Sequence, residues 1–270
     1  MSCRPGEGID LVAGGTTKFE PGSGKLGNRT GSSALRVSLG APSGLITSAN
    51  PLSSMAGTRV LLAGGNAFDA ALAVGATLNV VEPMSSSIAG NGFSTILDAA
   101  TGEVHSLAMA GAAPLAVDGD SMSEEELSQG YGAACTPGNM GGYLALIERF
   151  GTMSLADTLQ YAIEYAEGHP LSEATAAAIS AQASVLAKWP TSAALFLPGG
   201  SPPKVGETWA NPGLANTFKR IVAAEHRALA RGCSREEGIR AVSNSVNSRP
   251  DVTVQMKLWR SYFSHEFEPG

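Results

Sequence analysis

The fold of this chain is decided by residues 45–114, which read LITSANPLSSMAGTRVLLAGGNAFDAALAVGATLNVVEPMSSSIAGNGFSTILDAATGEVHSLAMAGAAP. Asn50 is a favourable helix N-cap, and Gly64 can end the helix that follows because glycine readily takes a positive φ. Asn66 can cap a second helix over residues 67–81. That second helix is apolar on nearly all sides, which is typical of a helix buried in a core. The stretch therefore predicts two consecutive helices, of which the second lies inside the protein.

A hairpin and further helices are predicted after these two helices. A Ser- and Gly-rich turn over residues 85–92 leads into strands over residues 93–97 and 104–109, joined by a tight turn that contains Gly102. After residue 138 the spacing of apolar residues becomes helical. We expect helices that begin near residues 138, 154, 214 and 234, one helix over residues 171–188 and a loop over residues 189–203.

Composition and charge exclude several classes of protein. The formal net charge is −6, from 18 basic and 24 acidic residues, which argues against a nucleic-acid partner. No run of about 18 apolar residues occurs, so no membrane-spanning helix is expected. The N-terminus shows no apolar signal region, which favours a cytoplasmic location. The four histidines lack metal-binding spacing, so neither a metal nor a cofactor is expected.

Five short blocks of sequence carry a family resemblance. They are GGNAFDA at residues 64–70, VVEP at 80–83, SSIAGNGF at 86–93, TPG at 136–138 and RFGTMSL at 149–155. In this order and spacing they resemble the start of the large subunit of the gamma-glutamyltransferase family. A single short block would be weakly specific, whereas several blocks in order are strongly specific.

The resemblance implies an α+β fold, namely the large-subunit part of an N-terminal-nucleophile αββα sandwich with a helix-rich segment after residue 138. In this family a precursor cuts itself into two subunits, and the new N-terminal Thr of the small subunit attacks an acyl group. The implied partners are a small-molecule amide substrate and a small subunit that carries the Thr nucleophile. The implied function is cleavage or transfer of the acyl group of an amide, gamma-glutamyl or related.

The resemblance also divides the chain into three parts. Residues 1–43 are rich in Gly, Ser and Pro and are predicted to form a flexible leader. Residues 44–250 are predicted to form the gamma-glutamyltransferase-like domain. Residues 251–270 are predicted to form a divergent tail, because the resemblance disappears before them.

The nucleophilic Thr of the family has no counterpart in this chain. The Thr-Thr pair at residues 16–17 lies upstream of the resembling blocks, and Thr253 is followed only by residues 254–270. We therefore expect no catalytic residue here and interpret the chain as the large part of a two-part enzyme. The alternative is a catalytically inactive, truncated remnant or a module that acts by binding alone.

An arginine of the family is also replaced. In the family, this guanidinium pairs with the α-carboxylate of the glutamyl group. Aligned on Ala113-Pro114, its position is Ala110 here, and no arginine lies between Arg59 and Arg149. Alanine cannot pair with a carboxylate, so the sequence favours an amide substrate that lacks this group, as in the amidohydrolase and acylase branches of the superfamily.

Two segments are predicted to bind the substrate. The resemblance places Met109, Ala110 and Gly111 at the acyl group. Ser86 and Ser87 lie in the Ser- and Gly-rich turn, and a turn of this kind can present backbone N–H groups to a ligand. These five residues are the predicted substrate-binding residues.

Overall fold

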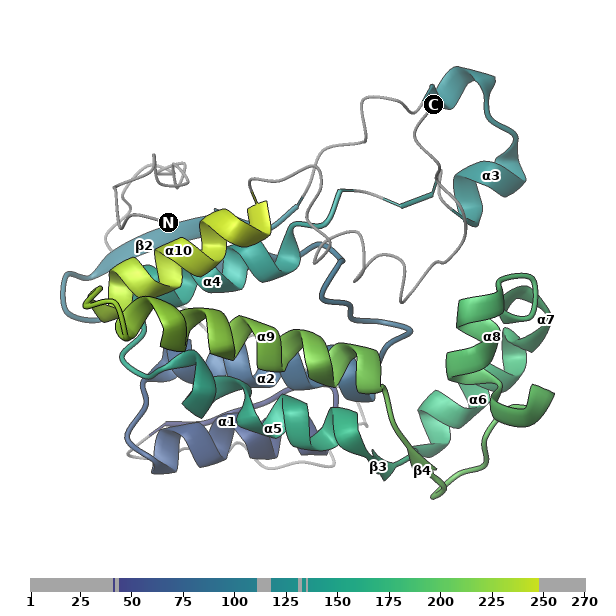
Figure 1. The fold of residues 1–270 in the computed structure, drawn as a ribbon, viewed down its shortest axis with the longest axis horizontal. Helices are drawn as coiled ribbons and strands as arrows, with labels where there is room; N and C mark the ends of the chain where they lie inside the picture. Colours follow the sequence, from purple (N-terminus) through teal and green to yellow (C-terminus); the bar gives the residue numbers. More distant parts are fainter. Residues whose placement is uncertain (1–40, 42–43, 111–117, 131–132, 135, 248–270) are drawn as a thin grey trace, which may run out of the picture.

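A buried helix, α2 (Ala67–Val81), lies at the centre of the fold. Helices α1 (Pro51–Leu62), α4 (Asn139–Phe150) and α5 (Leu155–Glu167) pack against it (Figure 1). The prediction of two consecutive helices with the second one buried is therefore confirmed. The structure is a computed structural model that describes residues 41, 44–110, 118–130, 133–134 and 136–247.

Two C-terminal helices complete the helical body. Helix α9 (Pro212–Leu229) packs against α5, and α10 (Arg235–Asn247) lies against α4 and α9 (Figure 1). Arg240 of α10 forms an ion pair with Glu148 of α4, with 2.7 Å between Nε and Oε1. The helix starts predicted near residues 138, 154, 214 and 234 are confirmed to within two residues.

The ends of α2 follow from the residues that flank it. The Asn66 side chain accepts hydrogen bonds from the backbone N–H groups of Phe68 and Asp69, at 2.9 and 3.0 Å. In return, the Asp69 carboxylate accepts the N–H of Asn66 at 2.9 Å, which completes a capping box. At the other end, Pro83 disfavours the α conformation for the residue before it. The predicted bounds of this helix, residues 67–81, are confirmed.

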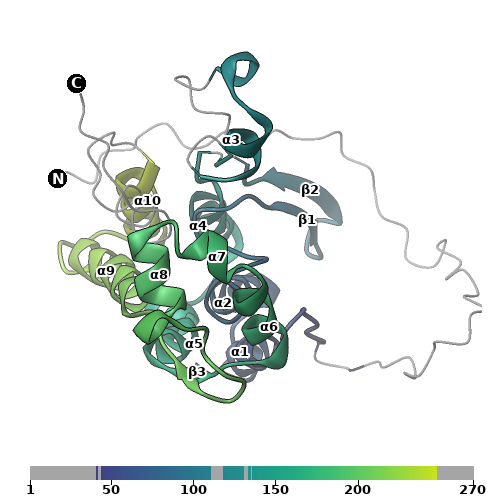
Figure 2. The ribbon, with the colours of Figure 1, turned by 90° about the vertical axis from the view of Figure 1, so that its right-hand side faces the viewer.

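The predicted hairpin is formed by β1 (Phe93–Asp98) and β2 (Glu103–Ala108), which pair antiparallel from the first residue of β1 to the last of β2. One face of the hairpin packs against Leu146 of α4 and is buried. The opposite face carries Phe93 and Leu97, which are 79% and 44% exposed. The hairpin therefore has one packed face and one open, partly apolar face (Figure 2 shows its position beside α4).

A lobe of short helices leaves the body between α5 and α9, at the right of Figure 1. The two connections to it pair as a short antiparallel ladder, β3 (His169–Pro170) with β4 (Thr208–Trp209). The Trp209 indole N–H donates to the carbonyl oxygen of Leu195 inside the lobe, at 3.1 Å. The lobe consists of α6 (Glu173–Ala181), α7 (Ala183–Leu186), α8 (Pro190–Phe196) and the 3₁₀ turn η2 (Pro198–Gly200). Two further short elements, η1 (Gly119–Ser121) and α3 (Glu124–Ser128), lie outside the lobe, between the hairpin and α4 in sequence.

Two predictions for the lobe are wrong. The helix predicted over residues 171–188 is interrupted at Gln182, whose backbone leaves the helical region with φ −101° and ψ 7°. The loop predicted over residues 189–203 contains α8. The alanine-rich sequence favours helix throughout, but the chain must turn back for Ile179 of α6 and Phe196 of α8 both to reach the core.

The turn between α4 and α5 is held by three charged side chains from other helices. Asp69 of α2 accepts the N–H and the hydroxyl of Thr152, at 3.0 and 2.7 Å. Arg235 of α10 donates to the backbone carbonyl oxygens of Gly151 and Met153 in the same turn. Glu225 of α9 accepts the N–H of Leu155 at 2.9 Å. The turn therefore connects α2 with the two C-terminal helices, α9 and α10.

Glu225 makes the stability of the protein dependent on pH. Its side chain is fully buried, and burial raises the pKa of the carboxyl; Asp157 adds to the rise, while the N–H of Leu155, His226 and Arg235 oppose it. A raised pKa means that the folded state holds this proton more tightly than the unfolded state does. The free energy of unfolding therefore falls as the pH rises from about 4.3, the ordinary pKa of a glutamate, through the raised pKa of Glu225. We expect Glu225→Gln, which carries no charge, to gain stability relative to the unsubstituted protein as the pH increases. Urea unfolding at several pH values between about 5 and 8 measures this difference.

A matched control is available at an exposed glutamate. The side chain of Glu164 is 64% exposed, so Glu164→Gln makes the same chemical change at the surface and serves as the reference for Glu225→Gln over the same pH range. A constant difference for Glu225→Gln would contradict the prediction.

None of the helices in the described part of the chain has both the length and the apolar character needed to cross a membrane. The predicted leader, residues 1–43, lies outside the described residues except at residue 41, and the predicted tail, residues 251–270, lies wholly outside them. The domain boundaries stay a prediction.

Candidate substrate-binding site

A Ser- and Gly-rich segment, residues 85–92, connects the end of α2 to β1. The N–H groups of Ser85 and Ser86 donate to the carbonyl oxygen of Glu82, at 3.0 and 2.9 Å. Farther along, the carbonyl oxygen of Gly90 accepts the N–H of Asn139, the first residue of α4, at 3.0 Å. These bonds hold the segment between the C-terminus of α2 and the N-terminus of α4.

The two serines predicted to bind substrate, Ser86 and Ser87, are half-buried. The Ser86 hydroxyl donates to Oδ1 of Asn79 in α2, at 2.8 Å. The Ser87 hydroxyl oxygen accepts the N–H of Ala89 at 3.1 Å, and the Ser87 carbonyl oxygen accepts from Nδ2 of Asn139 at 2.8 Å. Both hydroxyls therefore stabilise the segment, and the Ser87 hydroxyl keeps its own proton as a hydrogen-bond donor.

The end of the hairpin lies beside this segment. Met109 donates its N–H to the carbonyl oxygen of Gly92 at 2.8 Å, and Gly92 donates to that of Met109 at 3.3 Å. The Met109 side chain is buried against α4, with its Cγ 1.9 Å from the position that a Cβ of Gly142 would occupy. The next residue, Ala110, is exposed. Met109 thus anchors the hairpin on α4 and leaves Ala110 facing solvent.

Asn139 and Tyr143 of α4 connect the segment to α2. The Tyr143 hydroxyl lies 2.0 Å from the position that a Cβ of Gly75 would occupy, so the phenol ring packs directly on the α2 backbone. Burial raises the pKa of Tyr143, and a side-chain hydrogen bond with Asn139 opposes the rise. Because Asn139 also binds the Ser87 carbonyl oxygen, a continuous series of contacts runs from Gly75 to Ser87.

The structure brings the predicted site residues together only in part. Met109 and Ala110 lie next to the Ser- and Gly-rich segment through the pairing at Gly92. The side chain of Met109 is a packing group, and Gly111 lies outside the described residues. Sequence reasoning missed Asn139, for which the available signal was an Asn directly after the TPG block at a helix start. The binding role of all five residues stays a prediction.

The chemistry of this site is uncharged. Residues 85–92, Met109, Ala110 and Asn139 offer hydroxyl, amide and backbone groups and no charged side chain. Such groups bind uncharged polar atoms through hydrogen bonds, and they cannot form the bidentate ionic contact that an arginine makes with a carboxylate. The bonds described for the Ser86 and Ser87 hydroxyls join them to amide and backbone groups, not to a base that would activate a nucleophile.

Comparison with solved structures defines the class of fold. The chain resembles the gamma-glutamyltranspeptidase of Helicobacter pylori with a TM-score of 0.66 at 28% sequence identity, and the match covers 83% of this chain and 65% of that one. The fold is therefore that of the helix-rich large-subunit part of an N-terminal-nucleophile hydrolase.

Comparison of sequences gives the family. The family model described as gamma-glutamyltranspeptidase matches residues 53–234. The chain is 32% identical over 240 residues to the glutathione hydrolase proenzyme of Bacillus subtilis (strain 168), covering 83% of this chain. It is 36% identical over 199 residues to the acylase ACY 1 proenzyme of Pseudomonas sp. (strain V22), covering 69% of this chain. The chain belongs to the gamma-glutamyltranspeptidase family.

The chain spans about 40% of the length of the first of these relatives and 36% of the second. Both relatives are described as proenzymes, and the matched portion is consistent with a large subunit. The predicted family, the predicted α+β fold of N-terminal-nucleophile type and the interpretation of the chain as the large-subunit part are confirmed.

Proposed function

We propose that this chain is the large subunit of a two-subunit amide hydrolase or acyltransferase, and that a small subunit supplies the Thr nucleophile. The proenzyme relatives support a second subunit, because the chain matches less than half of their length. The chain then provides one wall of the substrate pocket, from residues 85–92 and the hairpin end at Ala110. The cytoplasmic location stays a prediction.

The open face of the hairpin carries this proposal. Phe93 and Leu97 project from it with 79% and 44% of their surface exposed. Among the described residues, β1 and β2 form a two-stranded sheet without a third strand, so the sheet has free edges. A free-edged sheet with large exposed apolar side chains is typical of a surface that pairs with another chain. We infer that the small subunit covers this face and extends the sheet.

Phe93→Asp is expected to prevent assembly with the small subunit, because it places a charge where an apolar contact forms. The unsubstituted chain should co-purify from its native host with a second chain that begins with Thr. Intact mass and N-terminal sequencing of the purified protein measure this. Met55→Asp is the matched control, since Met55 is 46% exposed on α1, away from the hairpin, and should leave assembly unchanged. A single species without a partner would contradict the proposed function.

The proposed substrate is an amide whose acyl group lacks an α-carboxylate, because Ala110 occupies the position that the family resemblance assigns to an arginine. We expect Ala110→Arg in the assembled enzyme to raise kcat/KM for a γ-glutamyl anilide by about tenfold or more, by restoring a charge-assisted bidentate contact. Ala100→Arg, at the exposed tip of the hairpin, should leave it unchanged. Efficient γ-glutamyl turnover without the substitution, or no gain with it, would count against this assignment.

A further inference from the structure

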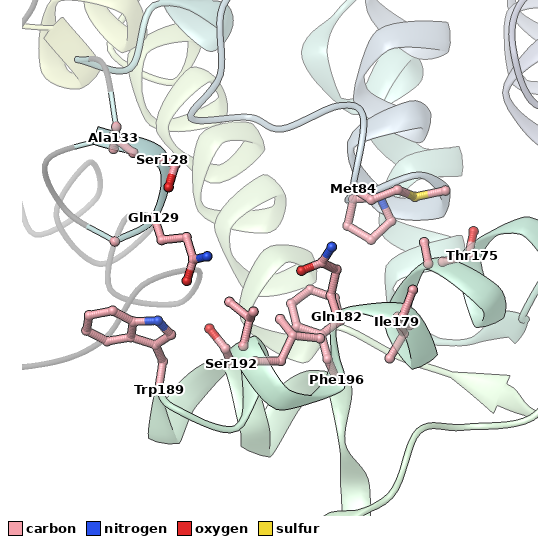
Figure 3. Close-up of a pocket in the computed structure, with 17 residues that line it drawn as sticks. Met84, Ser128, Gln129, Ala133, Thr175, Ile179, Gln182, Trp189, Ser192 and Phe196 are labelled. Atoms are coloured by element: carbon pink, nitrogen blue, oxygen red, sulfur yellow. The ribbon is translucent and has the colours of Figure 1, made fainter. Parts of the chain in front are cut away.

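A cavity lies between the lobe and the start of the Ser- and Gly-rich segment. It has a volume of about 650 Å³. Its walls come from α6 to α8, from the residues around the end of α3 and from the turn after α2, where Met84 lines it (Figure 3). Met84 directly precedes Ser85, so the cavity adjoins the candidate substrate-binding site without sharing its residues.

The lining of this cavity carries no charge. Its apolar surface includes Ile179, Trp189 and Phe196. Gln129 and Gln182 lie on opposite sides, with their amide groups turned toward the space between them (Figure 3). Each amide offers both a donor and an acceptor. An apolar lining with a few convergent polar groups, at this volume, is typical of a site for a small molecule.

Contacts among the wall segments keep the cavity formed. Gly130, with φ +81°, lies so close to the Trp189 ring that a Cβ there would be 3.2 Å from it. Phe196 stacks on Trp209 of β4, with 5.7 Å between ring centroids. Lys188 also pairs with Glu125 of α3 at 3.0 Å. The aromatic walls are thus fixed on both sides, by the segment after α3 and by the ladder at the base of the lobe.

We propose that this cavity binds an uncharged small molecule with an aromatic or branched aliphatic body and an amide group. The body packs against Ile179, Trp189 and Phe196, and the amide binds Gln129 and Gln182. A charged ligand is disfavoured, because no opposite charge lines the cavity to offset its loss of hydration. The proposal is independent of the proposed catalysis, since it concerns binding by this chain and does not require a small subunit.

Three probes of similar size and different charge test the proposal on the full 270-residue chain. Phenylacetamide is uncharged, phenylacetate is an anion and phenethylamine is a cation. Isothermal titration calorimetry should show phenylacetamide binding about tenfold or more tightly than either charged probe. Equal binding of all three probes, or no binding of phenylacetamide at millimolar concentration, would overturn the proposal.

Matched substitutions place the bound probe in the cavity. Ala178 of α6 lines the cavity, so Ala178→Trp should fill it and lower phenylacetamide affinity about tenfold or more. The exposed neighbour Ala177 does not line it, and Ala177→Trp should bind as the unsubstituted chain does. Gln182→Leu keeps the size of the side chain and should weaken phenylacetamide binding about tenfold through loss of the amide contact.

Two outcomes with these variants would overturn the proposal. One is equal affinity in Ala178→Trp and Ala177→Trp. The other is binding that appears only after removal of residues 251–270, which would make a segment of this chain the occupant. Circular dichroism checks that each variant is folded, and Gln182→Leu keeps the test decisive if Ala178→Trp is not.

Discussion

Asp69→Ala is expected to lower the free energy of unfolding by about 4 kcal/mol, because it removes a buried carboxylate that serves two helices at once. Asp69 is fully buried and accepts the N–H of Asn66, the N–H and hydroxyl of Thr152, and the N–H of Met153. Without the carboxylate, these donors lose the fully buried acceptor that they share. The midpoint of urea unfolding measures the change.

Two further substitutions distinguish the stabilising effect of the Asp69 carboxylate from that of an ordinary helix-capping residue. Asp157→Ala removes an exposed carboxylate that binds Ser154 at the start of α5, and should cost about 1 kcal/mol or less. Asp69→Asn keeps the shape but turns an amide N–H₂ toward backbone donors, so it should recover only part of the lost stability. If Asp69→Ala costs no more than Asp157→Ala, the turn at Thr152 does not depend on this carboxylate.

The local part of this arrangement was predictable from sequence and the distant part was not. Asn66 as an N-cap and the bounds of α2 follow from residues next to each other in the chain. The bond from Thr152 to Asp69 joins residues 83 positions apart, which no local pattern encodes. The break at Gln182 was missed for the same reason, because it depends on which side chains of the lobe reach the core.

In the candidate site, too, the local features were predictable from sequence and the contacts between distant residues were not. The Ser- and Gly-rich segment and the hairpin were predicted, and the pairing of Gly92 with Met109 explains why they lie together. Sequence reasoning assigned Met109 to the substrate, whereas the structure buries its side chain against Gly142. The missed residue, Asn139, acts through a bond to Ser87 that spans 52 positions. A glycine within a helix, such as Gly142, indicates close packing, but the residue that packs against it, here Met109, is known only from the structure.

Gly75→Ala is expected to destabilise the protein by about 2 kcal/mol, although alanine is the better helix former by about 1 kcal/mol. The added Cβ would lie 2.0 Å from the Tyr143 hydroxyl and 2.3 Å from its Cζ, so the half-buried ring has to move. Gly238 in α10 is the matched control, because a Cβ there meets nothing closer than 3.5 Å. Gly238→Ala should therefore stabilise the protein by about 0.5–1 kcal/mol.

A double-mutant cycle with Tyr143→Ala identifies the cause of the Gly75→Ala effect. Tyr143→Ala removes the ring that the new Cβ meets, so the two substitutions together should cost at least about 1.5 kcal/mol less than the sum of their separate costs. Additive costs would mean that the ring is not what excludes a side chain at Gly75. Because Tyr143 bonds to Asn139, and Asn139 holds the Ser87 carbonyl oxygen, displacing the ring also shifts the predicted substrate-binding segment. In the assembled enzyme, Gly75→Ala should then raise KM, while Gly238→Ala leaves it unchanged.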